Sequence, residues 1–341
     1  MIIEKNIDLR LHSTMRLGGR ASFSATIKSK EDLFEAIRFG NDNGLKIIPI
    51  GLGSNVIWRD TGFNGLLLIN RIQGLSVEDS GDEVIIRAGA GVSWDELVSR
   101  SVELNLTGIE SLSLIPGTVG ATPIQNVGAY GQEVSDTIVE IECYDLKTNQ
   151  FSILKNADCD FGYRTSRFKT FDKRKYIITK VTFKLSKDFP ILPLYPAVQN
   201  YFDDNDIKVT SPQTIRDAVI DIRKNKLPDP SEIANNGSFF SNPIISEHKF
   251  DQLQSEFSNI VYWQTEQGKY KIPAAWLIED VGMKGYDDKE TGMSIWPKQA
   301  VVFINKSANT TSDLLKFKQK IISLVFDKYG ITLEQEPEFL P

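Results

Sequence analysis

The chain has 341 residues, of which 41% are hydrophobic and 25% charged, a composition typical of a soluble globular protein with two or three domains. A net charge of -6 excludes an overall basic field, so we expect no nucleic-acid partner. The N-terminal MIIEKNIDLR lacks the apolar core of a signal peptide, and no later run approaches the ~20 apolar residues of a membrane span. These features predict a cytoplasmic protein without a membrane partner.

Cysteine and histidine are scarce. Cys143 and Cys159 form neither a CxxC pair nor a disulfide framework, and the histidines are His12 and His248. We therefore expect no metal site, and redox chemistry in this chain would need an organic cofactor.

The first third of the chain predicts alternating helix and strand. The segment KSKEDLFEAIRFGNDNG at 28–44 places Leu33, Ala36 and Ile37 at helical spacing and stops at Gly44. The short apolar runs LKIIPI, GLLLIN and EVIIRAGA read as strands. Next, VSWDELVSR predicts a helix that opens with a capping box of Ser93 and Glu96.

The middle of the chain is richer in strand. The runs IVEIECYDL at 138–146 and KYIITKVTFKL at 175–185 flank the loop DCDFGYRTSRFKT. A helix within 211–230 must end before Pro228, which suggests a domain boundary near residue 225.

A first glycine-rich loop follows the strand LKIIPI. Glycines let backbone amides approach a pyrophosphate, and serine and asparagine side chains can donate hydrogen bonds to it. The loop is not a Rossmann fingerprint, because Val56 takes the place of the third glycine and a strand follows. A purely structural turn is the alternative. The candidate residues are Gly51, Leu52, Gly53, Ser54, Asn55 and Val56.

A second loop, IPGTVGATPIQNVGAYGQE at 115–133, holds four glycines among small and polar residues. So much glycine indicates backbone packed closely against a ligand or another backbone. The amides of Gln125 and Asn126 could contact both donors and acceptors of a flavin-type ring.

The stretch NNGSFFSNP presents Ser238 after a glycine. Taken alone, it is ordinary turn chemistry. We do not expect a serine hydrolase, because the second glycine of the nucleophile elbow is missing and His12 lies near the N-terminus, where the required chain order cannot place it.

Taken together, these motifs resemble the UDP-N-acetylenolpyruvoylglucosamine reductase family, flavoenzymes that make UDP-N-acetylmuramate for peptidoglycan. The resemblance covers nearly the whole chain, through HSTMRLGG, GLGSNVIW, IPGTVGATPIQNVGAYGQE, FGYRTSRF, KLPDP, NNGSFFSNP, PAAWLIEDVGMKG, PKQAVVFIN and LEQEPEF. Each motif is weak alone, but their number and order are not expected by chance.

The resemblance implies an α+β fold. It would combine an FAD-binding fold of the vanillyl-alcohol-oxidase type, made of two α+β subdomains, with a C-terminal α+β substrate domain. On this basis the subdomains span 1–70 and 71–220, the substrate domain spans 221–333, and the tail 334–341 packs near the site. The match is to the longer class, whose tyrosine loop would carry Tyr195.

The implied activity is NADPH-dependent reduction of UDP-N-acetylglucosamine enolpyruvate through noncovalent FAD. By resemblance, Ser238 donates the proton, while Arg164 and Glu336 act at the substrate carboxylate. Without the family, Arg164 would be an exposed loop arginine and Glu336 part of a solvated acidic tail. The partner that makes the Ser238 proton available stays open among Lys226, Arg223 and water.

The resemblance also implies the binding residues. FAD would contact the first loop together with Pro116, Gly117, Gly120, Gln125, Asn126, Gly128 and Ala129. The UDP-sugar would contact Tyr195, Arg223, Lys226, Asn242 and Gln299. We expect a monomer that binds only small molecules. The alternatives are a flavin oxidase of the same fold and a non-catalytic flavin-binding protein.

The terminal LEQEPEF leaves a question of register among Glu334, Glu336 and Glu338. One continuous strand would point all three side chains to the same face. Family register selects Glu336. Pro337, which lacks an amide donor, is expected to end the regular pairing.

Overall fold

The computed structural model describes residues 1–192 and 194–341, which divide into two compact units. Unit 1 comprises residues 1–7, 21–52 and 64–224, and unit 2 comprises residues 8–20, 53–63 and 225–341. Helices and strands occur in both, so the predicted α+β class is confirmed. The division into three domains stays a prediction.

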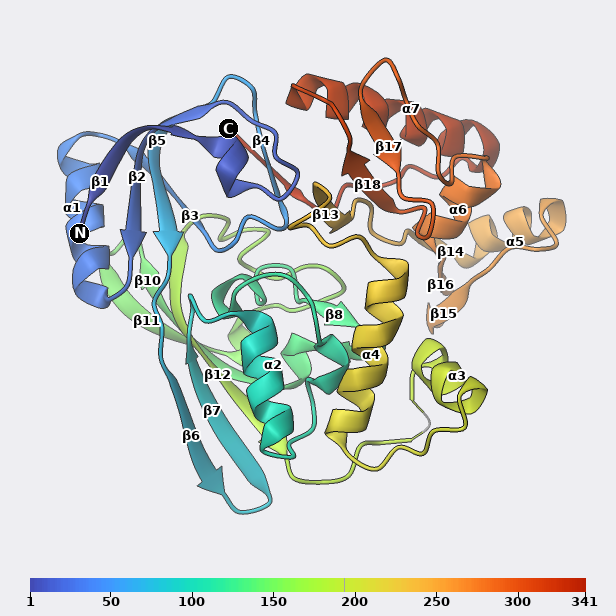
Figure 1. Ribbon diagram of the computed structural model, residues 1–341, viewed down its shortest axis with the longest axis horizontal. Helices are drawn as coiled ribbons and strands as arrows, with labels where there is room; N and C mark the ends of the chain where they lie inside the picture. Colours follow the sequence, from blue (N-terminus) through green and yellow to red (C-terminus); the bar gives the residue numbers. More distant parts are fainter. Residues whose placement is uncertain (193) are drawn as a thin grey trace. The chain divides into compact units, whose positions relative to one another are not determined.

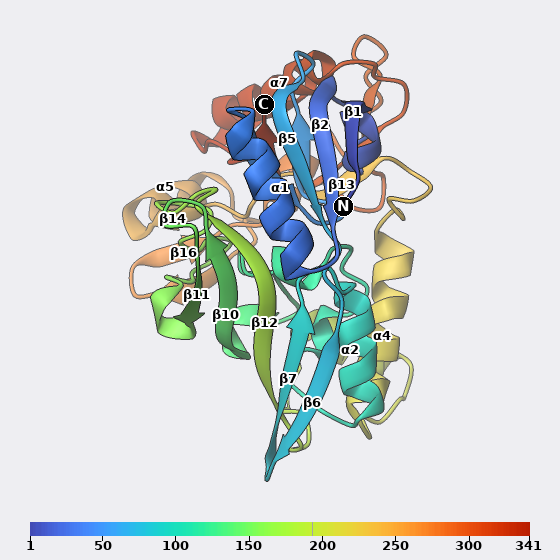
Figure 2. The same cartoon turned by 90° about the vertical axis from the view of Figure 1, so that its left-hand side faces the viewer.

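Unit 1 contains a four-stranded sheet and a helix that covers it. The sheet order is β1-β2-β5-β3, and β3 pairs in parallel with β5. Helix α1 (Lys30–Asp42) buries Leu33, Ala36 and Ile37 against this sheet, as the helical spacing predicted, and Figure 2 shows it across the sheet face. Gly44 follows the helix in the left-handed region, with φ of 62°. The strands are β1 (Ile3–Asp8), β2 (Arg20–Ile27), β3 (Lys46–Ile50) and β5 (Phe63–Asn70).

A five-stranded antiparallel sheet forms the rest of the framework of unit 1, in the order β11-β10-β12-β7-β6. Helix α2 (Trp94–Glu103) packs Leu97 and Val98 into a core shared with Ile86 and Phe183 of the sheet. The strands are β6 (Leu75–Ser80), β7 (Glu83–Gly89), β10 (Ile138–Asp145), β11 (Gln150–Lys155) and β12 (Tyr176–Ser186).

Two further helices complete unit 1. Helix α3 (Pro196–Asp204) packs on α4 (Pro212–Lys226), which ends before Pro228 as predicted and whose last two residues fall in unit 2. Helices α2 and α4 lie side by side (Figure 1) and are joined by an ion pair of Asp95 with Arg216. The short strands β8 (Gly128–Ala129) and β9 (Gln132–Glu133) form a hairpin.

The predicted capping box at α2 is wrong. Ser93 does occupy the N-cap position, but its side chain makes no capping hydrogen bond. Its backbone instead forms a bridge with Thr118, and the Trp94 N–H donates to the Gly117 carbonyl at 3.1 Å. The second glycine loop therefore contacts the backbone at the start of this helix.

Unit 2 is built around an aromatic core. Its central sheet has the order β13-β18-β17, with strands β13 (Asn235–Ser238), β17 (Met293–Ile295) and β18 (Val302–Asn305). Helix α7 (Thr311–Tyr329) covers it, and Phe317 of that helix lies 4.9 Å from Phe303 between ring centroids. A true capping box of Thr310 and Asp313 begins this helix.

The remainder of unit 2 comprises smaller elements. A second sheet has the order β14-β16-β15, with strands β14 (Ile244–Ser246), β15 (Trp263–Glu266) and β16 (Lys269–Lys271). Two helices accompany it, α5 (Glu247–Glu256) and α6 (Ala274–Asp280). Near the chain end, β19 (Glu338–Leu340) pairs in parallel with β4 (Val56–Trp58).

Candidate active site

Strand β13 presents Ser238 at its exposed end. Gly237 adopts a left-handed φ of 68°, and a bulge lies between the pairs Asn235 with Ile304 and Ser238 with Val302. The next two side chains, Phe239 and Phe240, are fully buried and pack on the ring of Phe303. Two buried aromatic rings therefore anchor an exposed hydroxyl.

The C-terminal tail lies directly beside this serine. The Ser241 N–H donates to the Glu334 carbonyl at 3.0 Å, and the Glu336 N–H donates to the Phe239 carbonyl at 2.9 Å. Glu336 is thus paired with the residue that follows Ser238. Unit 2 brings together two residues that the sequence assigned to catalysis from positions almost a hundred residues apart.

Pro337 ends the pairing of the tail with the Phe239 segment, as expected, but a new pairing with another strand begins directly after it. Before Pro337 the tail pairs antiparallel with the Phe239 segment, and after it β19 pairs in parallel with β4, beginning with a Glu338 N–H to Asn55 carbonyl bond of 2.9 Å. A residue without an N–H suits this change of partner, where no ladder bond is required of it. The tail is therefore two short pairings in succession and not one strand.

Part of the first glycine loop lies in the same unit. Gly53 has φ of 75°, and a Cβ there would lie 2.7 Å from the carbonyl carbon of His12 and closer still to its oxygen. The Gly53 carbonyl also accepts from the Thr14 N–H at 3.1 Å. The close approach of the chain's own backbone is therefore sufficient to require glycine at this position.

The second glycine loop in unit 1 packs against the segment that precedes α2. The Val119 N–H donates to the Val92 carbonyl and the Gly120 N–H to the Ala90 carbonyl, each at 2.9 Å. A Cβ on Gly120 would lie 2.5 Å from that of Ala90, and one on Gly51 would collide with the hydroxyl of Thr118. Of the two alternatives for this loop, tight packing on another backbone is present.

Asn126 organises the rest of this loop. It is buried with a left-handed φ of 48°, and its amide NH2 donates to Glu133 Oε2 at 2.7 Å and to the Gly162 carbonyl at 3.2 Å. Its Oδ1 accepts from the Ser135 N–H at 3.1 Å. The amide predicted to contact a flavin ring is thus engaged by the protein, and its role toward a cofactor stays a prediction.

Arg164 lies against the same loop. Its Nη2 donates to the Gly128 carbonyl at 2.6 Å, and its guanidinium lies 5.1 Å from the ring centroid of Tyr163. Arg164 is also in the left-handed region, with φ of 55°. Such conformations cost free energy and persist where the surroundings fix them, often at functional sites.

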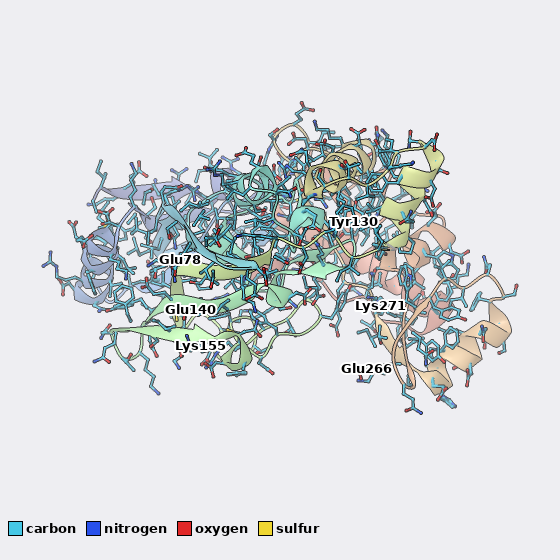
Figure 3. The ribbon with its side chains drawn as sticks, turned by 90° about the horizontal axis from the view of Figure 1, so that it is seen from below. Glu78, Tyr130, Glu140, Lys155, Glu266 and Lys271 are labelled. Carbon is cyan, nitrogen blue, oxygen red and sulfur yellow. The ribbon has the colours of Figure 1, made fainter. Side chains whose placement is uncertain are left out.

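Tyr195 precedes helix α3 as its N-cap residue and contacts a tyrosine that the sequence did not single out. The ring of Tyr195 lies 6.1 Å from that of Tyr130, which is labelled in Figure 3 on the segment after β8. Burial raises the pKa of the Tyr130 hydroxyl, and Arg223 opposes that shift. Burial lowers the pKa of Arg223, whose Nε is buried without a hydrogen-bond partner among residues 1–192 and 194–341.

Asp95 and Arg216, which form an ion pair, are two further residues that the sequence motifs did not identify. Burial would raise the pKa of Asp95, but hydrogen bonds from Arg216 and the Leu114 N–H hold that pKa below its usual value. Arg216 Nη1 lies 2.7 Å from Asp95 Oδ1 and also bonds the hydroxyl of Ser113 at 2.9 Å. Arg216 lies seven residues before Arg223 on α4, which is about two helical turns and places both arginines on one face of the helix. This spacing is the signal in the sequence that could have identified Arg216.

Three predicted substrate residues lie in unit 2. Trp296 links two of their segments, since its indole N–H donates to the Lys226 carbonyl at 3.0 Å and its own carbonyl accepts from the Gln299 N–H at 3.2 Å. Asn242 Oδ1 accepts from the Ala274 N–H at 2.9 Å and so caps α6, which leaves its NH2 group as a donor.

Burial raises the pKa of the Cys143 thiol to about 12 and that of Cys159 to about 11, so neither supplies a thiolate near neutral pH. Among the residues that the structure describes, no group of three His, Cys, Asp or Glu could hold a metal ion. In that same part of the chain, no helix has the length and apolarity needed to cross a membrane.

Comparison with known proteins gives matches along the chain. A sequence model described as "FAD binding domain" matches residues 21–149, and one described as "UDP-N-acetylenolpyruvoylglucosamine reductase, C-terminal domain" matches residues 229–340. Curated proteins named UDP-N-acetylenolpyruvoylglucosamine reductase are also similar. The protein from Ralstonia nicotianae is 38% identical over 98% of each chain, and that from Aliivibrio fischeri is 36% identical over 99% of this chain and 95% of its own.

A solved structure has the same fold. The crystal structure of UDP-N-acetylenolpyruvylglucosamine reductase from Thermus caldophilus superposes with a TM-score of 0.68 at 22% identity, covering 100% of both chains. Together with the FAD-binding match, this likeness confirms an FAD-binding fold followed by a C-terminal α+β domain, and the assignment to the vanillyl-alcohol-oxidase type stays a prediction.

Proposed function

Because the chain belongs to the UDP-N-acetylenolpyruvoylglucosamine reductase family, we propose that it reduces UDP-N-acetylglucosamine enolpyruvate to UDP-N-acetylmuramate. NADPH is the reductant and FAD the cofactor. This reaction supplies a precursor of peptidoglycan.

The residues present fit noncovalent FAD. In unit 2 the buried Oδ1 of Asn236 has no hydrogen-bond partner among the described residues, and the left-handed Gly53 of the first glycine loop suits a backbone turn at a pyrophosphate. Both thiols are buried and protonated, which disfavours a covalent tether through cysteine. When bound, FAD supplies the hydride chemistry, accepting hydride from NADPH and passing it to the enolpyruvyl double bond.

The pairing of the tail with the segment that follows Ser238 carries the proposal. Reduction of an enol ether joined to a carboxylate adds hydride to the outer carbon and builds negative charge at the inner carbon and the carboxylate. The Ser238 hydroxyl donates a proton to the inner carbon. The Glu336 N–H bonds the carbonyl of Phe239, the residue after Ser238, at 2.9 Å, which supports a role for Glu336 at the substrate carboxyl.

Arg164 balances the charge that develops on the substrate carboxylate. A guanidinium is a permanent cation whose planar fork matches a carboxylate. Electrostatic groups placed where charge develops contribute about 3 kcal/mol each. The Gly128 bond and the left-handed backbone hold Arg164 in one conformation, so little reorganisation is needed when substrate binds.

The UDP end of the substrate would contact Lys226, Asn242 and Gln299, which share unit 2 with Ser238. Lys226 is exposed and offers a point charge to a diphosphate, and the NH2 of Asn242 offers a donor. Tyr195 and Arg223 complete the proposed set from unit 1.

Several wider properties belong to the same proposal. The protein would act in the cytoplasm as a monomer and would bind no nucleic acid, in keeping with its net charge of -6. A flavin oxidase of the same fold is the rival enzyme, and a non-catalytic flavin-binding protein is the rival of another class. The C-terminal family match over residues 229–340 favours the reductase over both.

A steady-state assay tests this function. The purified protein should oxidise NADPH only when UDP-N-acetylglucosamine enolpyruvate is added. The loss of NADPH is measured as the decrease in absorbance at the nicotinamide band. NADPH consumption that depends on oxygen and ignores the UDP-sugar would favour the oxidase, and no consumption at all would favour the binding protein.

A further inference from the structure

Two adjacent asparagines in β13 differ in how their amides are satisfied. Asn235 donates from Nδ2 to the Ile233 carbonyl at 2.8 Å, and its Oδ1 accepts from the Gly237 N–H at 2.8 Å. Asn236 is only 7% exposed, and its Oδ1 is buried with no hydrogen-bond partner within residues 1–192 and 194–341. One amide is therefore complete within the protein and its neighbour is not.

The donor side of Asn236 fixes the amide orientation. Nδ2 donates to Thr14 Oγ1 and to the Ser54 carbonyl, each at 3.1 Å, and lies 3.4 Å from the Val56 carbonyl. A flipped amide would turn Oδ1 toward these two carbonyl oxygens and lose the donated bonds. Oδ1 is thus held on the opposite side, as an acceptor that awaits a donor.

A buried acceptor without a donor is unfavourable, and each such atom in a folded protein calls for an explanation. Thr14, Ser54, Val56 and Asn236 all belong to unit 2, so the arrangement is internal to one compact body. A bound ligand that offers an N–H or O–H would remove the penalty.

The neighbours of Asn236 indicate which part of a ligand it meets. On one side, its NH2 bonds the Ser54 carbonyl of the loop proposed for the FAD pyrophosphate. On the other, Asn236 lies two residues before Ser238, within about 7 Å along the chain, and Ser238 is proposed to face the reacting carbon beside the flavin ring. The ribityl chain joins the pyrophosphate to the ring and carries hydroxyl donors.

We propose that Asn236 Oδ1 accepts a hydrogen bond from a ribityl hydroxyl of FAD. This bond would fix the position of the cofactor between the first glycine loop and Ser238. This inference rests on the proposed FAD-dependent function. It makes Asn236 a cofactor-binding residue that no motif in the sequence marked.

The test measures cofactor affinity and not turnover. Flavin is first removed from the full-length protein. The flavin-free protein is then titrated with FAD, with three analogues that each lack one ribityl hydroxyl, and with N3-methylated FAD. Binding is followed by flavin fluorescence. We expect wild type to bind one of the deoxy analogues roughly tenfold more weakly than FAD. Asn236→Ala should bind FAD about tenfold more weakly and bind that analogue as it binds FAD.

Asn235→Ala is the matched control. It removes an amide that is already satisfied, so it should lower the melting temperature of the flavin-free protein while keeping the discrimination between FAD and the deoxy analogue. Equal loss of discrimination in both variants would overturn the inference, because the effect would then follow the turn and not Oδ1.

Other outcomes also decide the matter. If wild type binds every deoxy analogue as tightly as FAD, the inference fails whether or not Asn236→Ala folds, and a water molecule satisfies Oδ1 instead. If only the N3-methylated analogue is bound weakly and Asn236→Ala removes that difference, the donor is the ring N–H and the ribityl assignment is wrong. A protein that shows the expected discrimination but does not turn over NADPH would refute the proposed reaction and leave this inference standing.

Discussion

Gly53 offers the sharpest test of the site geometry. In Gly53→Ala the new Cβ would lie 2.7 Å from the His12 carbonyl carbon and closer still to its oxygen, so His12 would have to retreat by more than about 0.7 Å to restore contact at an ordinary 3.4 Å. Backbone shifts of this kind cost about 1 to 3 kcal/mol. The left-handed φ of 75° adds about 1 to 2 kcal/mol for a residue with a Cβ.

Gly282→Ala is the matched control for this substitution. Gly282 lies in the same unit with φ of 77°, but no atom lies within 4 Å of a Cβ built there. It should bear only the conformational cost. The free energy of unfolding should therefore fall by about 1 to 3 kcal/mol more in Gly53→Ala than in Gly282→Ala. Each kcal/mol of that difference should lower the melting temperature by about 2 to 4 °C.

Thermal unfolding and FAD titration of both variants give the answer. Because the Thr14 N–H bonds the Gly53 carbonyl and the Thr14 hydroxyl accepts from Asn236, a displaced segment 12–14 should weaken FAD binding in Gly53→Ala and leave it unchanged in Gly282→Ala. Equal stability of the two variants would refute the packing argument. Unchanged FAD affinity in Gly53→Ala would refute the placement of the cofactor beside this loop.

Three further predictions concern chemistry. Ser238→Ala should leave reduction of FAD by NADPH nearly intact and slow its reoxidation by the UDP-sugar by roughly 10² to 10⁴, because only that half-reaction needs a proton; an equal loss in both would make the serine structural. Glu336→Gln should slow the same step by about 10² to 10³, while Glu334→Gln and Glu338→Gln stay near wild type in stopped-flow traces, and a crippled Glu338→Gln would shift the register by two residues. The buried thiols, with pKa values of about 12 and 11 against 9.0 when exposed, bind more protons in the folded state, so the free energy of unfolding should fall as pH rises from about 9 to 11. Native protein at pH 9 should resist iodoacetamide, and rapid labelling would contradict that burial.

Local structure followed from local patterns. The spacing of Leu33, Ala36 and Ile37 identified the buried face of α1, and Pro228 bounded α4, because both depend on residues close in sequence. The prediction of a capping box at Ser93 was wrong: its side chain makes no capping bond, and its backbone instead bridges Thr118, more than twenty residues later. No local rule contains that contact.

The site shows the same limit. Family motifs selected Ser238 and Glu336, but the bond that joins Glu336 to Phe239, the residue after Ser238, is a long-range contact, and the change of partner at Pro337 depends on β4. Asn236 was invisible in the sequence because an asparagine beside a glycine is typical of turns. Asn235 and Asn236 are both buried, and the unpartnered Oδ1 of Asn236 is what distinguishes the two.

The most direct test of the central claim is a single turnover without oxygen. The FAD-loaded protein is reduced with one equivalent of NADPH and then mixed anaerobically with UDP-N-acetylglucosamine enolpyruvate, while flavin absorbance is recorded and the products are identified by mass spectrometry. We expect the flavin to reoxidise at once with one UDP-N-acetylmuramate formed per flavin. A flavin that stays reduced until oxygen is admitted, with the UDP-sugar recovered unchanged, would contradict the claim that this chain is a reductase of the enolpyruvyl group.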